Sequence, residues 1–333
     1  MKIELLRVLR CPSCHSSDEL VCACQPIEGE IIDGELRCNA CRTSYAIRHG
    51  IPRFVDGDNY AQSFGFQWNL YAKTQLDSHT GHPISRNRLF ETTRWPKDLS
   101  GQLVLETGCG AGRFTEILLS AGAKVYSFDY SVAVDANARN NAQHPNLHLF
   151  QADIFNIPAR AASFDKVLCL GVLQHTPDPE RALKSLAQYV RPGGELVIDS
   201  YQKSLTRILH WKYVLRPLTK RIKRERLHSM ISRVVPIMMP IAKTLRRLGG
   251  RAGARMVPIL EYSHFELPYE LEREWTVLDT FDMYSPAHDH PQSAGTLLRW
   301  LKEAKLVDTQ VYHAPNGLAG RGRRAEQSSP CQS

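Results

Sequence analysis

ETGCGAGRF, residues 106–114, is the stretch that decides the fold. It follows an apolar run at 103–105 and opens a helical pattern over 113–121, so its glycines provide a tight turn that lets the backbone approach a ligand. Downstream, strand-like and helical runs alternate over 124–129, 131–142, 147–150, 166–170, 179–190 and 195–199. This alternation predicts an α/β fold with a doubly wound, mostly parallel sheet.

Acidic residues follow the predicted strands in order. Glu106 opens the glycine turn, Asp129 closes the next strand, and Asp153 with Ile154 follows the third. Ligands of open α/β sheets bind at the carboxyl ends of the strands, where a carboxylate can accept hydrogen bonds from a ribose diol. The ordered set predicts a cofactor site, and the alternative is that the glycines serve only a turn.

Over residues 100–200, and extending to 315, the chain resembles the class I S-adenosylmethionine-dependent methyltransferases. The resemblance is carried by ETGCGAGRF, YSFDYS, QADIFNIP, FDKVLCLGVLQHTPDP and VRPGGELVIDS, in that order. It implies a seven-stranded Rossmann-like sheet and S-adenosyl-L-methionine as cofactor. By the same resemblance, Gly108, Gly110 and Gly112 would pass beside the cofactor, and Glu106 would support its amino-acid end through the loop. Asp129 would hold the ribose hydroxyls, and Asp153 with Ile154 would frame the adenine. A dinucleotide dehydrogenase shares the turn and the ribose acid but lacks the later AspIle and ArgProGlyGly elements.

Two further groups are candidates for the acceptor side. His175 follows a predicted strand end, and an imidazole that titrates near neutrality can take a proton from an acceptor. In the family that the chain resembles, a histidine here often only shapes the pocket, so both roles stay open. The segment 280–291 resembles a substrate-side segment, and its candidate contacts are Asp282, Tyr284, His288 and His290. A hydrogen-bonded loop is the alternative for that segment.

Six of the nine cysteines lie within the first 41 residues. The pairs Cys11 with Cys14 and Cys38 with Cys41 have the spacing of a four-cysteine zinc ribbon, which predicts a structural Zn²⁺. CysAlaCys at 22–24 offers competing ligands, and buried unligated thiols are the alternative. An odd, clustered count argues against a disulfide framework. Through LRCP and YAIRHGIP, this module resembles the small zinc-ribbon family that activates tRNA and protein methyltransferases.

A basic segment follows the predicted sheet strands. Residues 203–255 hold fifteen Lys and Arg against the one acid Glu225, a net charge of +14 in a chain of +8. Apolar residues are interleaved with these charges: Leu205, Ile208, Leu209, Trp211, Tyr213, Val214, Leu215 and 237–239. We expect basic helices, interrupted at Pro217, Pro236, Pro240 and the glycine pair 249–250, that cover the acceptor pocket. They form a lid packed on the sheet domain, a surface on an anionic membrane, or a nucleic-acid contact, and sparse aromatics disfavour the last.

The chain is therefore divided into a zinc-ribbon-like domain (1–55), a linker with N-terminal helices (56–98), a cofactor-binding core (99–202), a basic helical insertion (203–265), the remaining core with the substrate-side segment (266–318) and a flexible tail (319–333). The tail is expected from Gly320 onward. The first residues lack a signal-peptide pattern, and no apolar run in the basic part of the chain reaches the roughly 18 residues of a membrane span. We therefore expect a cytoplasmic location, with peripheral contact at the inner membrane face left open.

These features predict a methyltransferase that acts on a small-molecule or lipid-linked biosynthetic acceptor, sugar-like or polyketide-like. The alternative is an RNA methyltransferase acting on rRNA or tRNA, because a bacterial family that modifies ribosomal RNA also places a four-cysteine ribbon before a class I domain. A third hypothesis is a non-catalytic scaffold that keeps the cofactor fold. The intact motifs argue against it.

Overall fold

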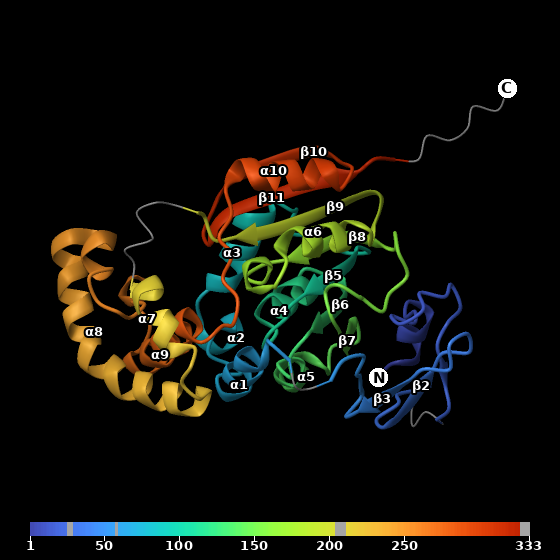
Figure 1. The fold of residues 1–333 in the computed structure, drawn as a ribbon, viewed down its shortest axis with the longest axis horizontal. Helices are drawn as coiled ribbons and strands as arrows, with labels where there is room; N and C mark the ends of the chain where they lie inside the picture. Colours follow the sequence, from blue (N-terminus) through green and yellow to red (C-terminus); the bar gives the residue numbers. More distant parts are fainter. Residues whose placement is uncertain (25–28, 57–58, 204–210, 327–333) are drawn as a thin grey trace.

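The computed structural model describes residues 1–24, 29–56, 59–203 and 211–326. A small β domain lies on one side of a central sheet with its helices, and a layer of longer helices lies on the other (Figure 1). Leu205, Ile208 and Leu209 of the predicted insertion fall outside the described residues, as does the predicted tail beyond residue 326.

The N-terminal domain is a four-stranded antiparallel sheet in the order β1-β2-β3-β4. Its elements are η1 (Ile3–Arg7), β1 (Val21–Cys22), β2 (Gly34–Arg37), β3 (Ser44–Arg48) and β4 (Ile51–Pro52). Alternate residues of β3 point inward, so Tyr45 and Ile47 are buried. They belong with Leu9 and Leu36 to a core cluster that continues into the central sheet. The two domains therefore share one hydrophobic core.

The central sheet has seven strands in the order β10-β11-β9-β8-β5-β6-β7. These are β5 (Leu103–Thr107), β6 (Lys124–Asp129), β7 (Leu147–Gln151), β8 (Phe164–Cys169), β9 (Val190–Ser200), β10 (Leu306–Ala314) and β11 (Gly317–Arg324). Strands β5 to β9 pair in parallel, and β11 runs antiparallel between β9 and β10. The predicted α/β fold with a seven-stranded, mostly parallel sheet is confirmed.

Helices cover both faces of this sheet because neighbouring residues of each strand point to opposite sides. Val104 and Val125 pack with α3 (Ile84–Thr93), α4 (Arg113–Ser120) and α5 (Val134–Asn141). Leu105 and Tyr126 lie on the other face, with α6 (Pro179–Ala187), α10 (Ala294–Glu303) and the N-terminal domain. The short helix η2 (Leu173–His175) follows β8, which places His175 at the same sheet edge as the glycine turn.

The third part is a layer of helices: α7 (Trp211–Thr219), α8 (Arg224–Ala254), η4 (Ser263–Phe265) and α9 (Tyr269–Tyr284). It has its own core, in which Leu227 and Val235 of α8 meet Val277 and Phe281 of α9. The helices α1 (Gln62–Leu70) and α2 (Asp77–Thr80) connect the N-terminal domain to α3, and Phe66 of α1 packs against the same core. Among the helices that the structure describes, none combines the length and the apolar character needed to cross a bilayer.

The basic segment differs from its prediction in two ways. Pro217, Pro236 and Pro240 do not interrupt it, because α7 runs through the first and α8 runs through the other two. Helix α8 loses helical backbone angles only at Gly249 and Gly250. An interior proline costs about 3 kcal/mol of helix stability, which packing against α9 offsets. In addition, the helical layer does not end at residue 265. Residues 269–284, assigned from the sequence to the remaining core, form α9 and pack on α8.

The predicted flexible tail over 319–333 is wrong for residues 319–324, which lie within β11. A Cβ at Gly320 would be 3.1 Å from the Cδ1 of Ile198, and one at Gly322 would be 2.9 Å from the Cβ of Leu306. The glycines that resemble a frayed end are therefore needed for close packing of β11 against its neighbours.

Candidate functional site

The glycine turn connects β5 to α4 at the carboxyl edge of the sheet. Gly108, Gly110 and Gly112 have left-handed φ angles of +69°, +52° and +91°. Gly108 and Gly110 line a large cavity, while Gly112 caps α4. A Cβ at Gly108 would lie 2.2 Å from the Cγ2 of Val172, and one at Gly112 would lie 2.3 Å from the Oδ1 of Asn137. Both positions therefore require glycine for space as well as for backbone angle.

Two buried carboxylates hold this turn. The Oδ2 of Asp129 accepts a hydrogen bond from the Gly110 N–H at 3.0 Å, and its Oδ1 accepts from the N–H and hydroxyl of Ser131 at 2.8 and 2.7 Å. Glu106 lies behind the turn, where its Oε2 accepts from the Ser127 hydroxyl at 2.7 Å. Burial raises the pKa of both carboxyls, that of Glu106 to about 7. Asp129 faces the cavity, so it combines loop support with an exposed acceptor edge.

The cavity has a volume of about 1560 Å³ and extends from the glycine turn to the helical layer. Ligand pockets commonly measure roughly 300–1,000 Å³, so this space has room for two ligands. Ile154, predicted at the adenine side, lines the cavity. The neighbouring Asp153 uses its Oδ1 to accept from the Phe155 N–H at 2.9 Å, and burial raises its pKa.

Aromatic residues of the predicted linker also line the cavity. Tyr60 precedes α1, and Phe64 and Trp68 lie on it; all three face the cavity. A Cβ at Gly110 would lie 3.1 Å from the Trp68 ring, so α1 covers the glycine turn. The sequence places these residues in a connecting segment. The aromatic run at 64–69 was the signal that could have identified them as part of the site.

His175 is buried and lines the same cavity. Its Nδ1 lies 3.1 Å from the carbonyl oxygen of His288, which can only accept, so Nδ1 carries the proton and Nε2 is the free acceptor. The ring packs 5.1 Å from Phe64 and 5.6 Å from Tyr201, centroid to centroid. Burial, with the charge of Lys212 adding, lowers the pKa of His175 to about 4. The imidazole is therefore neutral at physiological pH.

The substrate-side candidates do not all converge. Asp282, on α9, lines the cavity. Tyr284 is buried in the core of the helical layer, and its hydroxyl donates to the Pro258 carbonyl at 2.9 Å. His288 packs edge-on against Tyr60 at 5.3 Å, and His290 is an exposed ring stacked on His288. Only Asp282 thus faces the cavity directly, while His288 contributes its carbonyl to His175.

Two acids of α9 face the cavity with different surroundings. Asp279 accepts hydrogen bonds from Gln75 and Trp275, both at 3.0 Å, and from Tyr262. Among the described residues, Asp282 accepts one hydrogen bond, from the Gln67 side chain at 3.4 Å. Burial raises the pKa of each carboxyl to about 6. Asp282 is the acid with more capacity left for a ligand.

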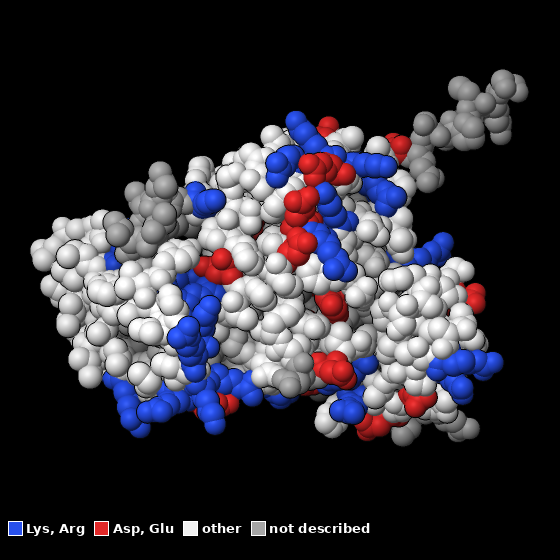
Figure 2. Space-filling model, in the orientation of Figure 1, with Lys and Arg blue, Asp and Glu red and all other residues white. Residues whose placement is uncertain are grey.

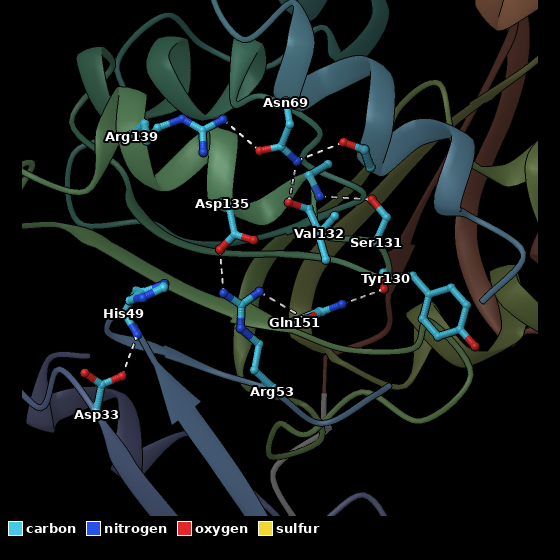
Figure 3. A network of polar contacts seen from close by, with 12 residues as sticks. Asp33, His49, Arg53, Asn69, Tyr130, Ser131, Val132, Asp135, Arg139 and Gln151 are labelled. Carbon is cyan, nitrogen blue, oxygen red and sulfur yellow. Dashed lines mark hydrogen bonds and ion pairs between the residues drawn. The ribbon is translucent and has the colours of Figure 1, made fainter. Parts of the chain in front are cut away.

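The N-terminal domain reaches the loop after β6 through Arg53 (Figure 3). The guanidinium of Arg53 pairs with Asp135 and donates to the Oε1 of Gln151 at 3.1 Å. Gln151 in turn donates to the Tyr130 carbonyl at 3.0 Å, directly after Asp129. The loop that carries Asp129 is therefore tied to the end of the N-terminal domain.

A second group of contacts holds α1 against the same loop. Asn69 donates to the Val132 carbonyl at 2.9 Å and accepts from Arg139 at 2.7 Å (Figure 3). A Cβ on Gly65 would lie 2.8 Å from the Val132 side chain, so α1 approaches this loop closely. The loop after β6 is thus fixed from two sides.

The four predicted cysteine ligands lie together in the N-terminal domain. Their sulfur atoms are all within 4.8 Å of one another, with 3.6 Å between Cys11 and Cys41 and between Cys14 and Cys38. Zinc–thiolate bonds of about 2.3 Å place the sulfurs of a tetrahedral site roughly 3.8 Å apart, so the cluster fits such an ion. Cys22 and Cys24 form a disulfide with each other, which removes them as competing ligands.

Two family models match separate parts of the chain. Residues 105–198 match the methyltransferase domain model, and residues 2–50 match the Trm112p-like protein model. The sheet order, glycine turn and carboxylates are those of the class I S-adenosylmethionine-dependent methyltransferase fold. The chain thus carries a class I methyltransferase domain preceded by a Trm112p-like domain.

Similar proteins include the ubiquinone biosynthesis O-methyltransferase of Coxiella burnetii, 34% identical over 114 residues, which are 34% of this chain and 49% of that protein. The namesake from Aromatoleum aromaticum is 33% identical over 130 residues, covering 37% and 55% of the two chains. The chain thus spans about half the length of these curated relatives. A solved Haloferax volcanii complex of the Trm112 methyltransferase activator with a putative methyltransferase is 12% identical, with a TM-score of 0.45 over 80% of this chain and 99% of that one.

Proposed function

We propose that this protein transfers a methyl group from S-adenosylmethionine to a small-molecule or lipid-linked acceptor, in the cytoplasm. The observation that carries the proposal is a single cavity that joins the glycine turn and Asp129 to His175 and Asp282. Methyl transfer from a sulfonium depends mainly on aligning the two reactants. One continuous cavity for cofactor and acceptor provides that alignment.

The residues at the cofactor end suit S-adenosylmethionine. Gly108 and Gly110 line the cavity with backbone alone, and Ile154 offers an apolar wall for an adenine. Asp129 Oδ2 accepts a single hydrogen bond from the protein, which leaves capacity for a ribose hydroxyl. The cofactor, when bound, supplies the electrophilic methyl group.

The acceptor end favours a compact molecule over a nucleic-acid strand. Its walls are aromatic side chains, including Phe64, Tyr201 and Tyr262. Two of the cations that line the cavity are paired within the protein, Lys212 with Asp289 at 2.9 Å and Arg246 with Glu261 at 2.8 Å. Their pairing leaves fewer charges for the phosphates of a nucleic-acid strand. The similar proteins are named as O-methyltransferases of ubiquinone biosynthesis, which supports a small-molecule or lipid-linked acceptor.

For an acceptor that must lose a proton, we assign the base to Asp282. A catalytic base works best with a pKa near the operating pH, and burial raises the pKa of Asp282 to about 6. His175 has a pKa lowered to about 4 and holds its Nδ1–H on a backbone carbonyl. His175 then forms the wall of the pocket and orients the acceptor.

Cofactor binding is tested by calorimetry on the full chain with S-adenosylmethionine alone. Asp129→Ala removes the ribose-side carboxylate and should weaken binding by about 1–3 kcal/mol, as expected for charge-assisted hydrogen bonds. The matched control is Glu303→Ala, a surface acid of α10 that should bind as wild type does. Wild-type protein that binds no cofactor would refute the proposal.

Acceptor class is tested with methyl-labelled cofactor. Metabolite, lipid and RNA fractions from cells that lack the gene are incubated with the protein, and mass spectrometry locates the added methylene. Label in the metabolite or lipid fraction is expected. Label confined to RNA would replace the proposed acceptor with the RNA alternative.

A further inference from the structure

Helix α8 has two apolar faces, of which only one is covered. The inner face is buried against α9 and contains Leu227, Ile231, Val235, Met239 and Ala242. The outer face contains Met230, Val234, Ile237, Ile241 and Leu248, which are between 40% and 82% exposed. At about 100° per residue, the five outer positions lie within an arc of about 60°. They therefore form one continuous exposed stripe, here called the outer stripe.

Cations run along one side of the outer stripe. On the same helical projection, Arg226, Arg233 and Arg247 lie within about 100° of the outer stripe. All three are on the side of the stripe that points away from the inner face. All three are exposed, and none has an ion-pair partner among the described residues. Figure 2 shows an uncharged surface at the α8 end of the molecule with Lys and Arg side chains gathered along its lower edge. An apolar stripe bordered by arginines is typical of helices that lie in the plane of an anionic bilayer.

The far end of α8 links this surface to the proposed active site. Arg246, Arg251 and Arg255 line the cavity, and the highly exposed Leu248 lies between the first two. Trp211 donates its Nε1–H to the carbonyl of Met256 at 3.0 Å, so a partly exposed tryptophan sits just beyond the helix. Tryptophan and arginine both favour the membrane–water interface.

We propose that α8 docks on an anionic phospholipid bilayer through the outer stripe, which brings the mouth of the cavity to the membrane surface. A bilayer satisfies both features at once, since acyl chains cover the stripe while lipid phosphates neutralise the arginines. Nucleic acid would neutralise the arginines and leave the stripe in water. Only the delivery of a lipid-linked acceptor to the cavity rests on the proposed function; docking does not.

The test is co-sedimentation of the full chain with vesicles of phosphatidylcholine alone or with roughly 30% phosphatidylglycerol. Wild-type protein should bind the anionic vesicles at low salt. Ile237→Glu with Ile241→Glu should lower the partition coefficient at least about tenfold, because two apolar side chains lose their burial. Arg226→Glu with Arg233→Glu should also lower it and make it less salt-dependent. The control Val307→Glu alters an exposed apolar residue on β10 and should leave binding unchanged.

Several results would overturn the docking proposal. The proposal is wrong if the wild type does not bind anionic vesicles at low salt, or if the Ile237→Glu, Ile241→Glu variant binds them as well as the wild type does. It is also wrong if light scattering shows a dimer that this variant abolishes, because the outer stripe would then belong to an interface with a second copy. Tighter binding to RNA than to anionic vesicles would also overturn the docking proposal. Calorimetry with S-adenosylmethionine runs in parallel, and all variants should keep wild-type affinity. A chain that binds vesicles but no cofactor would refute the proposed function and leave docking intact.

Discussion

The glycine turn allows a prediction in which backbone strain and steric overlap are measured separately. Gly108 has a φ of +69°, and an added Cβ would lie 2.2 and 3.0 Å from the two methyl carbons of Val172. Gly101 has a similar φ of +76° but no heavy atom within 4 Å of its added Cβ. Gly101→Ala should therefore report the left-handed backbone cost alone, about 1–2 kcal/mol.

Gly108→Ala should cost more because the clash adds to the strain. Overpacking contributes about 1–3 kcal/mol, so the total loss of unfolding free energy should be about 2–5 kcal/mol. Val172→Ala removes both overlapping methyl groups, and in the double variant it should recover the overpacking part. The two substitutions should therefore be non-additive by about 1–3 kcal/mol.

The assay is urea unfolding of the wild type and the four variants, with S-adenosylmethionine calorimetry as the second readout. Gly108→Ala should weaken cofactor binding, and the double variant should restore part of it, since the turn returns toward its native path. A Gly108→Ala protein no less stable than Gly101→Ala would refute the steric argument. Additive effects of the two substitutions would show that Val172 does not set the space at the turn.

Three further outcomes follow from the site. Metal analysis of the purified protein should find about one zinc per chain, and Cys38→Ser should lower that content. Chelation of the zinc should weaken cofactor binding. Zinc-free protein with native stability would contradict the zinc assignment. With an acceptor identified, kcat/KM should rise with pH up to about 6 and then level off, because the proposed base Asp282 acts when ionised. Asp282→Asn should abolish this rise, whereas His175→Asn should raise KM. A hundredfold fall in kcat for His175→Asn alone would instead identify the imidazole as the base. Burial lowers the pKa of His148 from 6.5 to about 3, so the unfolded chain binds the proton first and the free energy of unfolding should fall as pH drops below 6.5. His148→Phe keeps a ring stacked on Tyr126, and in thermal denaturation at a series of pH values it should reduce this loss of stability in acid.

Local patterns predicted the central sheet well because each strand and turn is determined by neighbouring residues. The glycine turn, Asp129 and Ile154 come directly after buried strands, and the sheet edge brings them to one cavity. The cysteine spacing likewise placed four sulfurs together. In both cases the information lies within a few residues of the chain.

The remaining features depend on contacts between distant segments. Trp68 reaches the glycine turn only because α1 packs on the loop after β6, and no local pattern shows that contact. β11 appears as a glycine-rich end until Ile198 and Leu306 are seen to exclude side chains. Tyr284 falls in a polar-aromatic segment, yet the helical layer buries it. Tertiary packing overrides composition at each of these positions.

We expect the N-terminal domain to influence the proposed cofactor site through structure, because a closed four-thiolate site would have no open position for chemistry. Its strand end holds Gln151 through Arg53, and Gln151 holds the Tyr130 carbonyl next to Asp129. On the other side, Lys2 donates to the His144 carbonyl at 2.6 Å, and Leu9 pairs with Ala159. These contacts lie on both sides of β7, so we expect removal of a metal from the predicted cysteine site to loosen this strand and the loop that carries Asp129 together. A metal with no catalytic position can therefore still set the affinity for the cofactor.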